Sequence, residues 1–528
     1  MNILIFLFLP LISGILLTLI GKDKYKFMFI LVQSILFILS IINLYTIRNI
    51  SFYELQFVEE DLLGIRLILD NKSSLFMSLN CFLFLIFEIY SYKDYQLDNL
   101  FHFIFLTIEA NINMIFLSND LFNIFVLIEV STILCSILIL YIKKKRTIYD
   151  GLVYLLTNTC GILFYLLGIA FIYKESATMD ITVISNNLDK VEIKNLILPI
   201  CLMLTGLSVK CALFPVFLWL PKAHGTHGAA SVVSAMLSGI YIKSTLFVFI
   251  RLFLIFREYI SIYKFFLIIG IITSLIGIVF AVLSKDLKLI LAYHTISQIG
   301  LILIAASSTE IKAMNASYQH MFNHALFKAS LFLTVGSITK LYGSRKISEI
   351  DGLFHKNKVL SMSLIFGILA ITGAPLFNGS ISKYFIATGY KDGIMKYILE
   401  VINLGTTISF IKLSSILFGK SKKEKIDLNE AIALILISVF LVITAILGEN
   451  IFSLISKLSV NIKIYDLIKK AVSWLIYVVI AIISYRYILP KFNLFKKGVQ
   501  LDLSFNTMII SIPLLFFFTL LYSQIFLF

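Results

Sequence analysis

The sequence predicts an all-α, polytopic membrane protein, and two observations support this fold class. Of the 528 residues, 59% are hydrophobic and only 14% are charged. Apolar stretches of about 18–25 residues, the length that crosses a bilayer as a helix, recur along the whole chain and are separated by short polar joints. A transmembrane β-barrel would instead show short segments of alternating polarity. We therefore expect a bundle of membrane-spanning helices.

Taken in chain order, the apolar stretches predict sixteen spans. They are 2–21, 26–47, 74–92, 99–117, 120–142, 150–173, 196–220, 229–256, 262–284, 287–307, 313–339, 359–389, 395–419, 430–448, 471–489 and 504–527. The first stretch follows no basic segment and is too long for the apolar region of a signal peptide. We therefore interpret it as a membrane helix.

The net charge of +15 is explained by topology rather than by nucleic-acid binding. If the N-terminus lies outside, the inside joints include the basic segments Lys143–Arg146, 340–358 and 420–425, whereas the outside joints 48–73 and 174–195 mix acids with bases. Lysine and arginine favour the cytoplasmic side of a bilayer. We therefore expect a multi-pass protein of the cytoplasmic (inner) membrane with its N-terminus outside, and no nucleic-acid partner.

All five cysteines lie in apolar stretches, and no two form a CxxC pair. They are Cys81, Cys135, Cys160, Cys201 and Cys211. This pattern argues against zinc or iron–sulfur ligation and against a disulfide framework. We expect buried structural thiols and no cofactor in this chain.

Two of the expected spans combine helix-breaking residues with a single lysine. The span 196–220 carries Lys210 shortly before a Phe-Pro, and the span 359–389 carries a Gly-Ala-Pro before Lys383. Proline kinks alone are common in membrane helices. Broken helices in corresponding positions of two repeats, however, point to an ion or substrate site near the midplane. A charge at that depth costs about 2.5–3.5 kcal/mol on insertion scales, so the lysines favour a functional interpretation.

A carboxylate in an earlier span is the candidate partner of Lys210. Glu129 lies nine residues beyond Asp120, which places it roughly 14 Å into its helix and near mid-bilayer. Intramembrane charges are rare unless they pair or line a pathway. Such a pair could be switched by a charge moving nearby and is a candidate proton site. The alternative is an inert salt bridge that sets helix register.

Further titratable residues form a row inside later spans. Lys243 lies early in its span, and His320, His324 and Lys328 follow one another in steps of four. Steps of four advance about 40° each, so these three form one stripe on a helix. With His294 in the preceding span they would suit proton transfer along the membrane plane. The HxxxH spacing also suits a metal or haem, but the lysine on the same face would repel a cation and no carboxylate or cysteine completes a ligand set.

Other polar residues receive structural interpretations. We expect Glu109 and Lys412 to lie near an interface or in packing pairs, and Lys288 to be an interfacial anchor. His224 and His227 follow the first broken span and are expected at the surface.

These motifs closely resemble the proton-conducting antiporter-like family, which comprises large membrane subunits of respiratory complex I, of Mrp-type Na⁺/H⁺ antiporters and of membrane-bound hydrogenases. The matching segments are SNDLFNIFVLIEV, VKCALFPVFLWLPKAH, SAMLSGIYIK, KDLKLILAYHTISQIG, NHALFKASLFL and GAPLFNGSISK. They cover roughly residues 74–420 in the family's order. Each alone is a weak signal, but together they are highly specific.

The resemblance implies a fourteen-helix core with inverted five-helix repeats and a broken helix in each. We place the N-terminal helices at 1–98, the repeats at 99–257 and 262–420, and the C-terminal helices, with about two extra spans, at 430–528.

The resemblance also implies roles for matching residues. Glu129 and Lys210 would form the gating ion pair, and Lys243 would be the bridge to a central relay. The relay would be the stripe of His320, His324 and Lys328, with Lys383 as the terminal site opening to one side.

The leading functional hypothesis is a proton-translocating, or Na⁺/H⁺-translocating, subunit of a multi-subunit membrane complex of the Mrp or membrane-bound hydrogenase type. Its partners would be other membrane subunits of that assembly, with iron–sulfur clusters only in partner subunits, and it would carry out no chemistry of its own. The alternatives are a complex I-type NADH/quinone oxidoreductase subunit and a stand-alone solute transporter. No long amphipathic lateral helix is expected after residue 450, which argues against a complex I L-type subunit.

Overall fold

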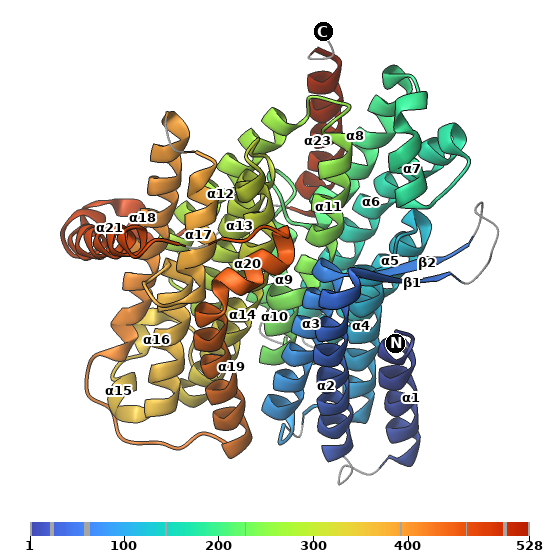
Figure 1. The fold of residues 1–528 in the computed structure, drawn as a ribbon. Helices are drawn as coiled ribbons and strands as arrows, with labels where there is room; N and C mark the ends of the chain where they lie inside the picture. The colour runs from blue at the N-terminus through green and yellow to red at the C-terminus, as the bar shows by residue number, and fades with distance from the viewer. Residues whose placement is uncertain are drawn as a thin grey trace.

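Helices form an upright bundle in the computed structural model, which describes residues 3–21, 26–56, 64–94, 96–142, 145–226, 229–390, 393–460, 462–499 and 504–525. Within these residues, thirteen helices are long and apolar enough to cross a membrane. Most of the long helices run side by side along one direction (Figure 1). The predicted all-α membrane fold is confirmed.

The first half of the chain supplies helices α1 to α11. Their bounds are α1 (Ile5–Ile20), α2 (Phe27–Ile50), α3 (Asn71–Ser91), α4 (Asn99–Leu117), α5 (Leu121–Leu140), α6 (Lys145–Ser176), α7 (Ile181–Asn187), η2 (Leu188–Lys190), α8 (Ile193–Lys210), α9 (Trp219–Gly225), α10 (Ser231–Met236), η3 (Leu237–Tyr241) and α11 (Ile242–Phe256). Aspartates begin several of these helices. The side chains of Asp70, Asp98 and Asp120 each accept a hydrogen bond from a backbone N–H in the first turn. Such caps satisfy N–H groups that the first turn leaves free, so short joints suffice between long helices.

The second half supplies the centre and the far side of the bundle. Its elements are α12 (Tyr263–Leu283), α13 (Leu287–Ala306), α14 (Ile311–Tyr342), η4 (Ile347–Glu349), α15 (Leu353–Lys356), α16 (Lys358–Thr372), α17 (Asn378–Thr388), α18 (Ile394–Ser414), η5 (Ser415–Leu417), α19 (Leu428–Ile446), α20 (Gly448–Ser456), α21 (Ile464–Ile483), η6 (Ser484–Ile488), η7 (Leu489–Lys491), α22 (Asn493–Lys497) and α23 (Phe505–Ile525). Helix α13 is buried along its whole length, and α14 is buried from Ala316 to Ile338. Polar side chains on these two helices therefore face other parts of the protein rather than lipid.

Both predicted helix breaks are present. Helix α8 ends at Lys210, and an irregular segment that contains Ala212 at φ 53° leads to α9. Helix α16 ends where Gly373 adopts φ 78°, and Leu376 at φ 67° precedes α17. Left-handed backbone at non-glycine residues is uncommon and costs energy, so the surrounding helices must hold both breaks in this conformation.

Close approach between helices depends on glycine. A Cβ at Gly206 of α8 would lie 2.6 Å from the backbone nitrogen of Tyr165 on α6, and a Cβ at Gly168 would lie 2.7 Å from the carbonyl oxygen of Pro199. Small residues let membrane helices pack backbone to backbone. The α6–α8 contact therefore holds the helix that carries Lys210 in a defined position.

The joint 48–73 contains a β-hairpin that the apolar pattern does not predict. Strands β1 (Phe52–Gln56) and β2 (Arg66–Asp70) are antiparallel, with Phe52 opposite Asp70 and Gln56 opposite Arg66. The hairpin projects sideways from the bundle in Figure 1.

The C-terminal region corrects one expectation. Helix α21 lies across the flank of the bundle instead of parallel to its neighbours (Figure 1). It is thus the lateral helix that was expected to be absent, although its length and composition alone are those of a membrane span. Helix α23 is upright and contacts α8, where Cys201 Sγ and Ser523 Oγ lie 3.4 Å apart. Hydropathy reports how apolar a helix is, not its orientation, so only the packed structure distinguishes the two.

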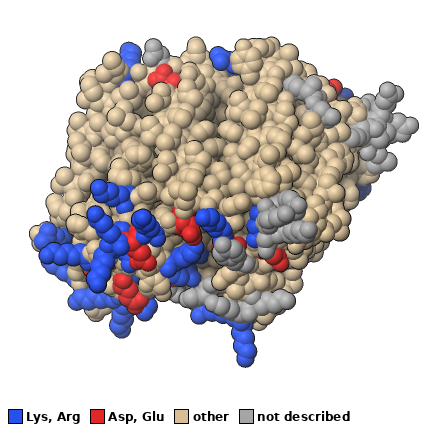
Figure 2. Space-filling view, turned by 90° about the horizontal axis from the view of Figure 1, so that it is seen from below, with Lys and Arg blue, Asp and Glu red and all other residues tan. Residues whose placement is uncertain are grey.

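Basic residues gather on one end of the molecule. Figure 2 shows this end with many Lys and Arg side chains, interspersed with fewer Asp and Glu, over one part of an otherwise uncharged surface. The end includes the joints after α14 and before α19. Lys143, Lys144 and His227 lie outside the described residues.

Candidate functional site

Glu129 and Lys210 each bond to a threonine hydroxyl group instead of to each other. The Lys210 ammonium donates to Thr132 Oγ1, which lies one turn from Glu129 on α5. Glu129 Oε1 accepts a hydrogen bond from Thr159 Oγ1 at 2.9 Å, and its Oε2 has no hydrogen-bond partner among the residues that the structure describes. Lys210 is 2% exposed, whereas Glu129 is half-buried beside the exposed Val130. The two charges are therefore close in the fold but are not bonded to each other.

Tyrosine hydroxyls extend this contact toward the next lysine. Thr132 Oγ1 lies 3.3 Å from the hydroxyl of Tyr241, and that hydroxyl accepts a hydrogen bond from Tyr154 at 2.8 Å. Tyr241 belongs to η3, a single π-helical turn, and Lys243 follows two residues later. Such turns inside α-helices are frequent at functional sites.

A chain of hydrogen bonds joins Lys243 to Lys328. The Lys243 ammonium donates to the carbonyl oxygen of Ser238. Ser238 Oγ lies 2.5 Å from Thr295 Oγ1, which in turn donates to the carbonyl oxygen of Leu291 at 3.1 Å. The Lys328 ammonium donates to the same carbonyl at 2.6 Å. Both lysines have no exposed surface. Each ammonium group donates to a backbone carbonyl oxygen, and the hydroxyl groups of Ser238 on η3 and Thr295 on α13 lie between these two carbonyls.

The histidine stripe lies on the face of α14 that meets α13 and α17. His320 Nε2 lies 3.0 Å from Gln298 Oε1, and its Nδ1 lies 2.9 Å from Ser382 Oγ. The ring of His324 is nearly parallel to that of His320, with centroids 6.3 Å apart, and neither of its nitrogens has a hydrogen-bond partner among the described residues. The predicted stripe is therefore buried and contiguous, and His320 connects it to α17.

Lys383 lies at the far end of the row, whereas His294 lies beside the middle of the stripe, on α13. Lys383, next to Ser382, donates to the carbonyl oxygen of Ile371 at 2.9 Å in the last turn of α16. A cation is stabilised there by the carbonyl groups that a helix end leaves free. His294 Nε2 contacts Ser409 Oγ on α18, and its ring lies 4.5 Å from that of Phe410. His294 thus lies on the α18 side of α13, away from Thr295 and its bonds to η3.

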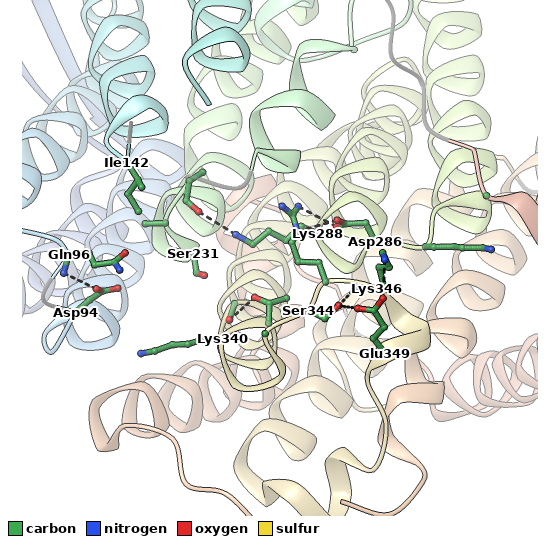
Figure 3. A pocket seen from close by; sticks show the side chains of 18 of the residues that line it. Asp94, Gln96, Ile142, Ser231, Asp286, Lys288, Lys340, Ser344, Lys346 and Glu349 are labelled. Atoms are coloured by element: carbon green, nitrogen blue, oxygen red, sulfur yellow. Dashed lines mark hydrogen bonds and ion pairs between the residues drawn. The ribbon is translucent and has the colours of Figure 1, made fainter. Parts of the chain in front are cut away.

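Two cavities lie toward opposite ends of the molecule, and the smaller one reaches the row at Lys383. The larger, about 1150 Å³, lies at the basic end and is lined by charged residues that include Lys288, Asp286 and Arg345 (Figure 3). The smaller, about 220 Å³, is lined by Lys383 and Lys470 and by residues of α18 near its start. Because consecutive long helices alternate in direction, the start of α18 lies at the end opposite to the basic one.

Helix α21 covers the smaller cavity. Lys470 donates to the carbonyl oxygen of Ser380 at 3.0 Å, and Trp474 Nε1 donates to Thr372 Oγ1 at 3.3 Å. These contacts bind the lateral helix to both sides of the break between α16 and α17. The lateral helix is therefore part of the surroundings of Lys383.

His224 corrects a second expectation. It is completely buried instead of exposed, and its ring stacks on Phe332 with centroids 4.6 Å apart. Gly225 follows His224 in the chain, and its carbonyl oxygen accepts a hydrogen bond at 2.9 Å from Arg345, which lines the larger cavity. The Lys328 ammonium lies 5.8 Å from the Phe332 ring. His224 therefore lies between the larger cavity and the lysine of the stripe.

Sequence reasoning missed the polar groups that connect the row. They are Thr132, Thr159, Ser238, Tyr241, Thr295 and Ser382. Hydroxyl and amide residues occur throughout the spans and cost little there, so their identity carries no signal until their partners are known. Lys288 also differs from a snorkelling anchor, because it is 6% exposed and its ammonium lies 3.4 Å from the carbonyl oxygen of Ala229.

Lys412 has a structural explanation. Its ammonium donates to the carbonyl oxygens of Ala281, Val282 and Ser284 at 2.6–2.8 Å, where α12 ends. A lysine in this position satisfies carbonyl groups that lack helical partners.

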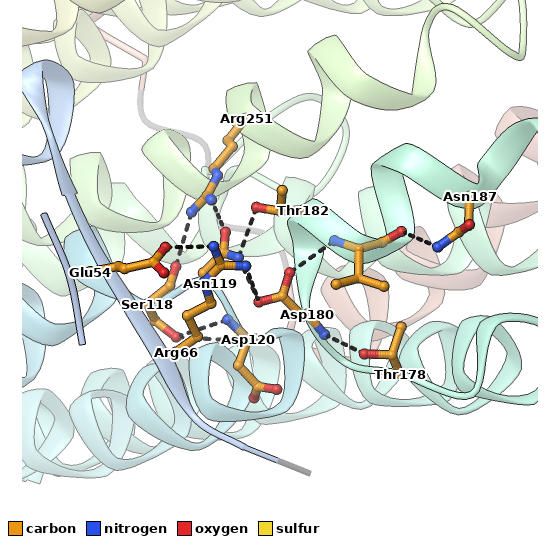
Figure 4. Close-up of polar contacts among 11 residues, drawn as sticks. Glu54, Arg66, Ser118, Asn119, Asp120, Thr178, Asp180, Thr182, Asn187 and Arg251 are labelled. Atoms are coloured by element: carbon orange, nitrogen blue, oxygen red, sulfur yellow. Dashed lines mark hydrogen bonds and ion pairs between the residues drawn. The ribbon is translucent and has the colours of Figure 1, made fainter. Parts of the chain in front are cut away.

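At the end opposite to the basic one, Arg251 ties several segments together (Figure 4). It donates to the carbonyl oxygen of Ser118 at 2.9 Å and to the side chain of Asn119. Asn119 in turn donates to Asp180 Oδ2 at 2.8 Å. The cluster joins α11 to the α4–α5 joint and to α7, so it holds the start of the helix that carries Glu129.

No group of three or more His, Cys, Asp or Glu side chains that could hold a metal ion occurs in the described parts of the chain.

Comparisons with known proteins agree with this architecture. The sequence profile of the family described as NADH:quinone oxidoreductase/Mrp antiporter, TM, matches residues 118–411. The chain is 29% identical over 323 residues to the putative antiporter subunit mnhD2 of Staphylococcus saprophyticus, and this match covers 60% of the chain and 64% of that protein. It is 27% identical over 350 residues to a Na(+)/H(+) antiporter subunit of Alkalihalophilus pseudofirmus, with 64% of the chain and 70% of that protein covered.

Two solved structures share the fold over a longer part of the chain than the family profile covers. A chain of the membrane-bound sulfane sulfur reductase, an archaeal respiratory membrane complex, superimposes with a TM-score of 0.81 at 22% identity, covering 90% of this chain and 99% of that one. A chain of the Mrp complex from Dietzia sp. gives a TM-score of 0.80 at 20% identity, with coverages of 89% and 99%. The profile match includes Glu129, Lys210 and the whole histidine stripe. The chain belongs to the NADH:quinone oxidoreductase/Mrp antiporter transmembrane family.

Proposed function

We propose that this chain is the proton-translocating subunit of a multi-subunit membrane complex of the Mrp or membrane-bound hydrogenase type. The observation that carries the proposal is the row of buried lysines and histidines, with hydroxyl groups between them, that runs through the protein interior to the smaller cavity at Lys383. Ionisable residues buried in a membrane protein are rare, and a row of them that ends at a cavity is the arrangement found along ion pathways.

In this proposal Glu129 and Lys210 act as a switch. When the Lys210 ammonium leaves Thr132 for the Glu129 carboxylate, the positive charge that Lys243 experiences decreases. Lys243 then holds its proton more strongly, and the return of Lys210 expels that proton toward Lys328, past the hydroxyl groups of Ser238 and Thr295. Moving one charge against 100 mV requires about 2.3 kcal/mol, a small demand on a buried charge pair.

The stripe then passes the proton to the outlet. His324 and His320 lead from Lys328 to Ser382 and the neighbouring Lys383, which the smaller cavity reaches. His294, on α13, is a further titratable group of this relay. We further propose that 99–257 and 262–420 are inverted repeats, that the basic end faces the cytoplasm, and that any iron–sulfur cluster belongs to partner subunits.

Ion coupling in variants that still assemble tests the switch. We expect Lys210→Met and Glu129→Gln to abolish proton translocation by reconstituted vesicles, and Glu129→Asp to keep part of it. The control is Lys194→Met, because that side chain is 74% exposed and pairs only with Glu192. Native gels establish that each variant is assembled. Translocation at the wild-type rate by assembled Lys210→Met protein would refute the mechanism.

The parent complex is tested separately. Affinity purification of the native assembly, followed by mass spectrometry and a visible spectrum, distinguishes the candidates. Iron–sulfur absorption with catalytic subunits supports a redox-driven complex, which would be of hydrogenase or complex I type. A colourless sample with small membrane subunits supports an Mrp-type antiporter. Purification of the chain alone, with solute uptake, would support a stand-alone transporter instead.

A further inference from the structure

A second buried polar seam lies between α3 and α4, apart from the lysine–histidine row. Two pairs of positions face each other across these antiparallel helices. His102 Nδ1 lies 2.7 Å from Glu88 Oε2, and both side chains are at most 2% exposed. On α3, Cys81 precedes Glu88 by seven residues, and on the antiparallel α4, Glu109 follows His102 by seven residues. At 1.5 Å per residue, Cys81 and Glu109 therefore lie about 10 Å from the Glu88–His102 pair, on the same side of it. The profile match begins only after this seam, at residue 118.

Glu109 is a buried carboxylate surrounded by amides. It has no exposed surface, and its Oε2 accepts a hydrogen bond from Gln33 Nε2 of α2. Asn80 Nδ2 donates to the carbonyl oxygen of Glu109 at 3.2 Å and to Asn113 Oδ1 at 2.9 Å. No lysine or arginine forms an ion pair with Glu109 within the described residues.

Three oxygen atoms of this cluster have no hydrogen-bond partner within the part of the chain that the structure describes. They are Glu109 Oε1, Gln33 Oε1 and Asn80 Oδ1, and they come from three different helices. Buried oxygen atoms in proteins are almost always satisfied by a donor or by an ion. An uncompensated carboxylate is far too costly in the interior, so Glu109 must carry either a proton or a cation.

The number of charges selects the kind of cation. One carboxylate balances one positive charge, and the surrounding amide groups are neutral. A divalent ion would keep an excess positive charge in the protein interior, which is costly. Oxygen atoms from carboxylate and amide groups are, however, suitable ligands for a small hard cation at membrane depth.

We propose that the Glu109 cluster is a binding site for Na⁺, which replaces a proton on the Glu109 carboxylate and is held by Gln33 Oε1 and Asn80 Oδ1. Binding requires Gln33 to rotate its amide so that the oxygen, not the nitrogen, faces the ion. The Glu88–His102 pair lies on the side toward the basic end, where Leu97, at the start of the same seam, lines the larger cavity. This pair marks the route to the site.

The charged groups near the site are few. Cys81 and Glu88 face it from α3, and His102 lies on its own helix. Helix α1 carries no titratable side chain, and Arg48 of α2 lies in the last turn. The charged groups on the other helices that contact α4 are committed elsewhere, because Glu129 bonds to Thr159, Lys243 to Ser238 and Arg251 to Ser118.

The proposal goes beyond the proton relay and does not depend on it. Equilibrium binding of radioactive Na⁺ to the purified full-length chain, with choline as the background salt at alkaline pH, tests it directly. We expect saturable binding of one Na⁺ per chain in the wild type and its loss in Glu109→Gln. Gln33→Met keeps the side-chain volume but removes a ligand, so we expect binding roughly tenfold to hundredfold weaker, as for loss of a polar contact to a charged group.

Glu430→Gln is the matched control. Glu430 is also a buried carboxylate, but it already has a cation, with Lys340 Nζ at 2.9 Å. This variant should bind Na⁺ like the wild type. If Glu109→Gln does not fold, as judged by thermal unfolding, Gln33→Met and Asn80→Leu decide the question. The proposal is overturned by absent saturable binding in the wild type, by wild-type affinity in the Glu109 or Gln33 variant, or by equal loss in Glu430→Gln.

Discussion

Thr295→Val tests whether the hydroxyl bridge between Lys243 and Lys328 carries protons. Valine has nearly the shape of threonine, so the change removes one hydroxyl group and little volume. Two contacts disappear, the one at 2.5 Å to Ser238 Oγ and the one at 3.1 Å to the carbonyl oxygen of Leu291. Ser238 Oγ is left buried with one partner fewer.

The expected magnitude follows from these contacts. Leaving a buried polar group without its partner costs about 1–3 kcal/mol, which is the expected loss in free energy of unfolding. If the hydroxyl also passes the proton, the barrier between the two lysines rises by at least the net value of one hydrogen bond. An increase of about 1.4 kcal/mol slows translocation roughly tenfold.

The assay is proton uptake into vesicles that contain the reconstituted complex, followed with a pH-sensitive dye and normalised to assembled protein on native gels. Thr334→Val is the matched control, because Thr334 is equally buried but its hydroxyl donates only to Ser330 of its own helix, at 2.8 Å. A rate for Thr295→Val equal to that of the control would refute the role of the bridge, whatever the two variants do to stability.

Three further predictions concern stability. Gly379→Ala should unfold at a much lower temperature than Gly225→Ala, because a Cβ at Gly379 would lie 2.0 Å from the carbonyl oxygen of Ala370, whereas a Cβ at Gly225 would lie 3.0 Å from the end of the flexible Leu289 side chain. Similar unfolding midpoints would contradict this packing of α17. Lys412→Met should lower the free energy of unfolding by about 2–3 kcal/mol but keep proton translocation in the assembled fraction, because Lys412 serves only the end of α12. Abolished translocation at full assembly would place it in the pathway instead. Glu88→Leu should lower the free energy of unfolding by about 3–5 kcal/mol, because it leaves His102 buried without its partner, and the additional change His102→Leu should recover part of that loss. Denaturant titration of the single and double variants measures the coupling energy between the two residues. Additive losses would mean that the Glu88–His102 pair contributes no stability.

Much of the architecture could be predicted from local patterns. The spans follow from runs of apolar residues, and the two breaks follow from glycine and proline within such runs. The residues proposed for the pathway could also be predicted, since Lys210, Lys243 and Lys328 are costly at bilayer depth and therefore conspicuous. These signals need no knowledge of neighbouring helices.

Other features could not be predicted in this way. Thr295 is one hydroxyl residue among many, and its importance depends on η3 packing against α13. His224 follows a proline in a polar joint, which suggests a surface position, but Phe332 of α14 covers it. The sequence suggests an interfacial or packing role for Glu109, and only the approach of α2 and α3 reveals that its oxygen atoms and those of Gln33 and Asn80 lack donors.

The sequence by itself determined which segments are membrane helices, where two of them break and which rare charges must be accommodated inside, because each depends on the cost of placing one side chain or backbone group in a bilayer. Only the tertiary structure decided that α21 lies across the bundle, that hydroxyl groups connect the lysines and that a carboxylate is surrounded by amides. Those features depend on the distances between side chains from helices far apart in the chain, and hydrogen bonds change from strong to absent within about one ångström.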